Sequence, residues 1–177
     1  MTLVAEKIVV TALEFLETRN INDSHDFNDP LFKTKMNEYG WDLSFSAASI
    51  VCELIWKIAV RGGGMSEYRQ LDRLFSPSPV ATHCNFRGCP EYKTGNLPEV
   101  GAIAVYKKGN GWKGTMLIVV KVSEDKKSFD GIEGRVLEGS DEKFLTLEMK
   151  NRVVGLPFKT DKMNLIGFIY PPNREIS

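Results

Sequence analysis

The hydrophobic pattern of the chain changes its period once, near Gly101, and this change is the strongest constraint on the fold. Before it, apolar residues recur every three or four positions, which is the spacing of amphipathic helices. After it, they alternate with polar residues or form short β-branched runs between turn residues, which is typical of strands. This order predicts an α+β fold whose N-terminal helices pack on an antiparallel β-sheet of about five or six strands.

The pattern predicts helices at residues 2–18, 31–39, 45–60 and 66–75. The segment 45–60 is apolar nearly all round, so it should lie at the centre of the core. The segment 76–99 carries four of the eight prolines and is expected to be a long irregular connection. Strand patterns then fall at 102–106, 116–122, 128–132, 135–138, 144–149, 152–154 and 165–170.

A chain of 177 residues fits a single domain over residues 1–177. We divide it into a helical part (1–75), a connection (76–99), a β part (100–171) and a C-terminal tail (172–177). The 23 basic residues equal the 23 acidic ones, so no overall field recruits nucleic acid or an anionic membrane. Charged residues interrupt the first twenty positions, and we therefore expect no signal peptide and no membrane span.

Three cysteines do not form a disulfide framework. Cys52 lies in an apolar helical run, where a buried free thiol is common. Cys84 and Cys89 with His83 suggest zinc, but these three lie in one short stretch and lack the second pair of ligands that structural sites use. We therefore expect no metal and no cofactor.

Five segments in a fixed order carry a family resemblance. They are Gly40-Trp41 with 45–48 and the following helix, 97–105, 114–120, 132–135 and 166–171. Together they resemble the motifs of papain-like cysteine amidases of the CHAP or NlpC type, a family that includes phage endolysin-like peptidoglycan hydrolases. The resemblance implies a papain-like (NlpC/CHAP-like) fold.

The departures from the family pattern fall on its chemistry. A cysteine amidase of this type uses a thiolate at the N-terminus of the central helix, a histidine base at the start of a strand, and a polar residue that orients the imidazole. By the resemblance, Ser46 stands in the place of the cysteine, Thr115 in that of the histidine and Arg135 in that of the asparagine. Threonine has no titratable nitrogen, and a serine without a base stays protonated. These degenerate positions imply a pseudo-enzyme with no catalytic residues.

A relocated site is the alternative to this loss. Cys52 with His25 or His83 would have to rebuild both the pair and the oxyanion geometry, and ordinary core and loop positions explain these residues more simply.

The resemblance therefore predicts a structural or interaction module of a bacteriophage virion, such as a tail or head-tail connector protein, located in the virion or the host cytoplasm. Its partners would be other proteins of the assembly, with homo-oligomers among the options. Two alternatives stay open: a module that binds the stem peptide of peptidoglycan, and an active cell-wall amidase whose motifs lie in another register.

Overall fold

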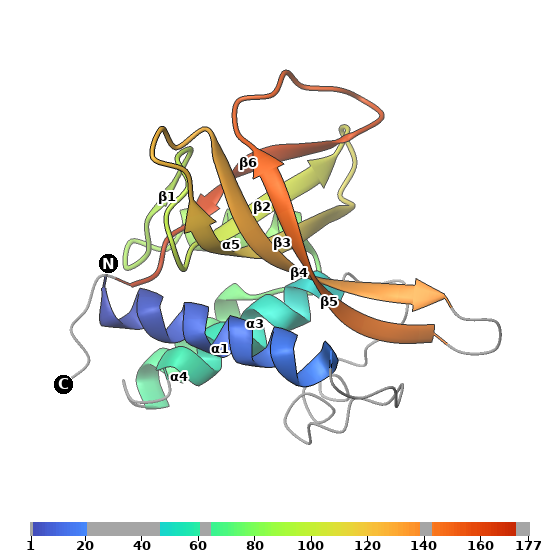
Figure 1. Cartoon of the computed structure of the whole chain (residues 1–177). Helices are drawn as coiled ribbons and strands as arrows, with labels where there is room; N and C mark the ends of the chain where they lie inside the picture. Colours follow the sequence, from blue (N-terminus) through green and yellow to red (C-terminus); the bar gives the residue numbers. More distant parts are fainter. Residues whose placement is uncertain (1, 21–46, 61–64, 139–142, 173–177) are drawn as a thin grey trace.

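A computed structural model describes residues 2–20, 47–60, 65–138 and 143–172 (Figure 1). Within them the chain is α+β, with four helices and a six-stranded antiparallel sheet, which confirms the predicted class. The helices are α1 (Leu3–Asn20), α3 (Ala47–Val60), α4 (Met65–Leu74) and α5 (Pro79–Arg87). The strands are β1 (Thr94–Gly95), β2 (Ile103–Lys108), β3 (Gly114–Val122), β4 (Ser128–Glu138), β5 (Lys143–Val153) and β6 (Met163–Ile169). Among the described residues, no helix combines the length and the apolar character that a membrane crossing requires.

The sheet has the order β1-β6-β2-β3-β4-β5. Helices α1 and α3 lie together on one face of it, and α3 contacts β3 and β4 (Figure 1). The main core fills this interface. All residues of α3 except Ile58 are buried, as a sequence that is apolar nearly all round predicts, and the buried set includes the charged Glu53 and Lys57. In α1, the buried residues Val4, Ile8 and Ala12 form the predicted stripe.

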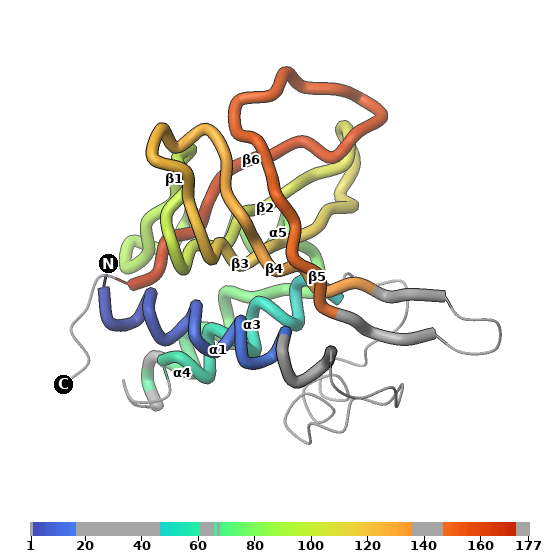
Figure 2. Tube along the Cα trace, in the orientation of Figure 1, coloured from blue at the N-terminus to red at the C-terminus, as the bar shows by residue number. Residues whose placement is uncertain are grey.

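A second, smaller core lies on the other face of the sheet, because the sheet curls on itself. Phe129 of β4 and Phe168 of β6 are separated by two strands, which in a flat sheet would put them about 14 Å apart. Their ring centroids are 5.5 Å apart. Val154, which follows β5, packs into this second core. The segment 154–162 then arches from the end of β5 to the start of β6 (Figure 2).

The expectation of an irregular connection over 76–99 is wrong, because the segment contains α5. Ser78 caps this helix: its side chain accepts a hydrogen bond from the backbone N–H of Ala81. Pro79 occupies the first turn, where its missing N–H costs nothing. One of the four prolines in this segment therefore begins a helix.

Two pairs of predicted strands are single long strands. The runs 128–132 and 135–138 are joined in β4, and 144–149 and 152–154 fall largely in β5. The predicted break between the two runs of β4 contains Gly134, but the strand continues through it. A Cβ there would stand 2.6 Å from Cγ2 of Val51, so glycine lets α3 approach the strand.

Candidate functional site

Two of the three degenerate positions lie among the described residues. Thr115 is in β3 and is 9% exposed, and Arg135 is in β4 and is exposed. Ser46 and the predicted helix 31–39 lie outside the described residues, as do Gly40-Trp41 and His25. Ala47, the residue after Ser46, begins α3.

Thr115 lies on the face of the sheet that is turned away from α3. Its partner in the β2–β3 register is Tyr106 of β2, and Leu117 lies two residues further along β3, so both share its face of the sheet. Tyr106 and Leu117 belong to the second core. Its neighbour Met116 points the other way, into the core shared with α3. A side chain at position 115 is thus directed away from the helix that follows Ser46.

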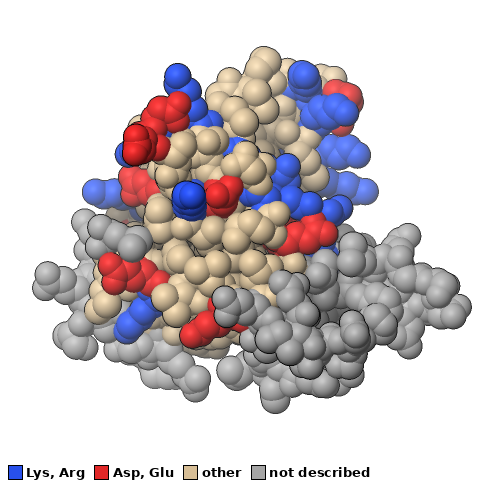
Figure 3. Space-filling view, in the orientation of Figure 1, with Lys and Arg blue, Asp and Glu red and all other residues tan. Residues whose placement is uncertain are grey.

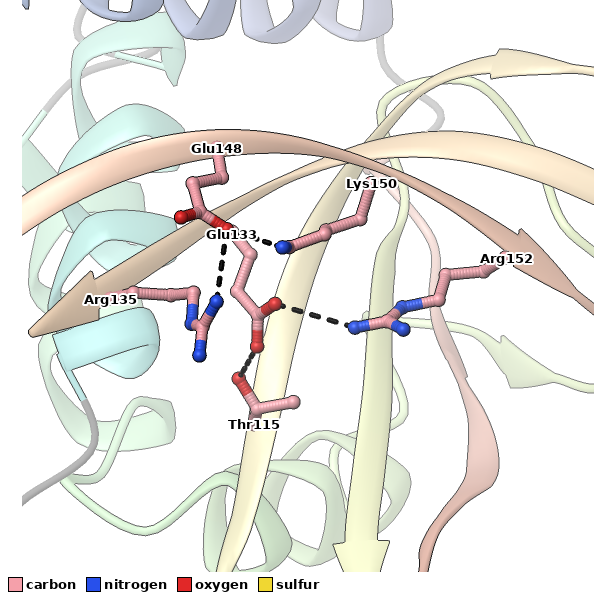
Figure 4. A network of polar contacts seen from close by, with 6 residues as sticks. All are labelled: Thr115, Glu133, Arg135, Glu148, Lys150 and Arg152. Carbon is pink, nitrogen blue, oxygen red and sulfur yellow. Dashed lines mark hydrogen bonds and ion pairs between the residues drawn. The ribbon is translucent and has the colours of Figure 1, made fainter. Parts of the chain in front are cut away.

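Thr115 and Arg135 belong to two neighbouring sets of polar contacts, which together form a network over β3, β4 and β5 (Figure 4). The Thr115 hydroxyl donates to Oε1 of Glu133 at 2.5 Å, and Nη2 of Arg152 donates to Oε2 of the same carboxylate at 3.4 Å. Nη1 of Arg135 donates to Oε2 of Glu148 at 3.0 Å.

Charge balance explains why this network holds together. Glu133 and Glu148 lie directly opposite each other in the β4–β5 register, where two like charges repel. Arg152 pairs with the first, and Arg135 and Lys150 pair with the second. Hydrogen bonds from Lys150 and then Arg135 lower the pKa of Glu148. Three cations thus compensate two carboxylates.

The Thr115 hydroxyl and the Glu133 carboxylate are bonded to each other within the protein. Both carboxylate oxygens of the buried Glu133 already accept hydrogen bonds, and the Thr115 hydroxyl is committed to one of them. Sequence reasoning singled out Thr115 and Arg135 but missed Glu133, Glu148 and Arg152. The signal was present in 148–152, where charged residues alternate with others in a strand and so share one face.

Of the residues that a relocated site would use, the structure describes Cys52 and His83. Cys52 is fully buried, and its burial, followed by the nearby charge of Glu133, raises the pKa of its thiol. Burial, followed by the charge of Arg87, lowers the pKa of His83, which packs against Gly167. The Cys89 thiol donates to Glu91 at 2.9 Å. In the part of the chain that the structure describes, no three His, Cys, Asp or Glu side chains are grouped to hold a metal ion.

Tyr106 borders the network from β2. The guanidinium carbon of Arg152 lies 5.6 Å from the centroid of its ring. Its hydroxyl is buried and has no hydrogen-bond partner among the described residues. Burial raises the pKa of Tyr106 to about 12, and the charge of Arg152 opposes this shift.

We predict that Tyr106→Phe is no less stable than the parent at pH 7, because it removes a buried hydroxyl that lacks a partner. The pKa of this tyrosine is about 10 in the unfolded chain, so the folded parent holds the phenolic proton more tightly than the unfolded chain does. The stabilisation that comes from this tighter proton binding is fully present below about pH 10 and is lost as the pH rises towards 12. Over that range the free energy of unfolding of the parent should therefore fall relative to that of the variant. Urea unfolding from pH 7 to 11 measures both. A variant less stable by more than about 1 kcal/mol at pH 7 would reveal a partner for the hydroxyl.

No protein-family model, curated protein sequence or solved structure matches this chain.

Proposed function

We propose that this chain is a catalytically inactive amidase-like protein that works as an interaction module, as a component of a bacteriophage virion such as its tail or head-tail connector. The scaffold in this proposal is papain-like. One observation carries the proposal: the Thr115 hydroxyl donates a hydrogen bond to Glu133. By the resemblance, Thr115 stands where the amidases have their histidine base.

The order of the elements supports the papain-like scaffold. A buried helix, α3, directly follows Ser46 and packs against β3 and β4. The segments that resemble the amidase motifs then supply β2, β3, β4 and β6 in turn. Gly134 of β4 meets the first turn of α3, since a Cβ there would stand 3.2 Å from the carbonyl oxygen of Ala47.

The residues near the motif positions support the loss of turnover. A general base must reach the proton it abstracts, and must titrate in a useful range. Thr115 lacks a titratable nitrogen and faces away from α3. If the motif register is shifted by one residue, the position falls to Met116, which is fully buried and does not titrate. Neither register therefore supplies a base.

A hydrolysis assay tests the loss of activity. We expect purified protein to release no more material from bacterial cell walls, and to cleave no more of an acyl-dipeptide, than buffer alone. Because Ser46 and Cys52 are the candidate nucleophiles, Ser46→Ala and Cys52→Ser are the informative controls. Turnover that either substitution abolishes would refute the proposal and favour the active amidase.

Fractionation of virions tests the structural role. We expect the protein to co-purify with particles through a density gradient. If it is absent from particles and remains a soluble monomer in the lysate, the virion role fails. Shifts of its amide resonances on addition of a peptidoglycan stem peptide would then favour the wall-binding alternative.

A further inference from the structure

A pocket of about 420 Å³ lies on the side where the curled sheet stays open. One wall is the chain that leaves β5, residues 153–157, and the other is β6 from Met163 to Gly167. Tyr106 and Asn96 also line the pocket, with Lys159, Lys162 and Asn164. The Asn164 side chain bonds the backbone of Lys159 and Lys162, which fixes the loop beside the pocket.

The β6 wall of this pocket is an open strand edge. β1 pairs with β6 only at Ile169 and Phe168. From Met163 to Ile166, β6 has β2 on one side, and no strand of the described chain pairs with its other side, whereas Gly167 is buried beside Gly95 and His83. The backbone N–H and C=O groups of such an edge are a template for an added strand.

Exposed apolar side chains surround the same pocket. Val153, Leu156 and Met163 line it and are 48%, 71% and 46% exposed. Phe158, in the same loop, is 56% exposed. A monomeric protein rarely leaves such a contiguous apolar group in water unless a partner covers it.

The charge of the pocket is positive. Its lining includes Lys159 and Lys162 and no acidic residue. Lys162 has one exposed acidic neighbour, Asp161, with 3.9 Å between Nζ and Oδ2. The backbone N–H of Gly109 donates to the Lys162 carbonyl, which joins this loop to the β2–β3 hairpin and its lysines. Basic side chains gather on the upper right of Figure 3, where these two loops lie.

We propose that this open edge binds an extended peptide segment of a partner protein, with apolar residues in its middle and acidic residues at its ends. The segment adds a strand to β6. Its apolar side chains cover Val153, Leu156 and Met163, and its carboxylates face Lys159 and Lys162. The inference rests on the proposed function in that it takes the chain to be an interaction module, and it names the chemistry of the partner.

The test is a titration of the isotope-labelled full chain with acetyl-Glu-Val-Thr-Val-Thr-Val-Glu-amide, followed by NMR. We expect saturable shifts of the amide signals of 153–157 and 163–167. A peptide with lysines in place of the glutamates should bind more weakly, because it meets like charges. A version of the acidic peptide that is N-methylated at alternate residues keeps the side chains but cannot pair with a strand edge, and it should not bind.

A paired charge reversal, Lys159→Glu with Lys162→Glu, should raise the Kd of the acidic peptide by about tenfold. Lys7→Glu, which changes an exposed lysine of α1, is the matched control and should leave the Kd unchanged. The proposal is overturned if the acidic peptide shifts no signal of β6, if the N-methylated peptide binds equally well, or if octanoate alone saturates the same site with equal affinity. Turnover of cell walls would refute the proposed function without moving these signals, so the two failures are distinguishable.

Discussion

Replacing Trp56 with alanine is expected to lower the free energy of unfolding by about 3–5 kcal/mol, because it empties the centre of the helical layer. Trp56 is fully buried in α3. Its ring lies 6.1 Å from that of Phe75, 5.8 Å from that of Phe86 and 6.4 Å from that of Tyr92, between centroids. It therefore holds α3 against α5 and the chain on either side of α5. Urea unfolding followed by circular dichroism measures the loss.

Trp112→Ala is the matched control, because Trp112 is 72% exposed at the tip of the β2–β3 hairpin. This change should alter stability by less than about 0.5 kcal/mol. Trp56→Phe is a milder test at the buried site. It retains an aromatic ring and removes an indole N–H that has no partner among the described residues, so it should cost less than alanine. Equal losses at Trp56 and Trp112 would contradict the packing described here.

The hydrophobic pattern of the sequence predicts the helices correctly where burial alone decides which residues are apolar. The stripe of Val4, Ile8 and Ala12 predicted α1, and apolar character nearly all round predicted the buried α3. The helix expected at 66–75 is α4, one residue earlier. Helix α1 follows the helical period because it buries one stripe, whereas α3 is apolar nearly all round because it is packed between α1, α4 and the sheet.

Sequence reasoning failed where a residue serves a distant neighbour. Gly134 lies between two strands that the sequence predicts as separate, although its role is to let α3 approach the continuous strand β4. Pro79 lies in the segment 76–99, which the sequence predicts to be irregular, although Ser78 caps a helix there. The curl that brings Phe129 to Phe168 depends on how successive strands twist, which no local pattern encodes. The candidate site was hidden for the same reason, because Glu133 meets its partners only after three strands align.

The other large effect is expected at Lys57, a charged residue in the middle of α3. Lys57 is 2% exposed and forms ion pairs with Glu53, on the preceding turn of the same helix, and with Asp72 of α4. Its Nζ also lies 4.8 Å from the centroid of the Tyr68 ring. The side chain thereby ties α4 to α3 through charges, in addition to the apolar residues Leu71 and Leu74 that α4 places in the same core.

We predict that Lys57→Met lowers the free energy of unfolding by about 3–5 kcal/mol, although methionine has a similar length and is apolar. The loss arises because methionine forms neither of the two ion pairs of Lys57, while the Glu53 carboxylate, itself 3% exposed, stays buried. Replacing both members, as Lys57→Met with Glu53→Leu, should recover part of it, since a buried ion pair exchanged for apolar residues is often close to neutral. Lys7→Met on the exposed side of α1 is the control. The prediction is contradicted if Lys57→Met lowers the free energy of unfolding no more than Lys7→Met does, or if the double variant is less stable than Lys57→Met alone.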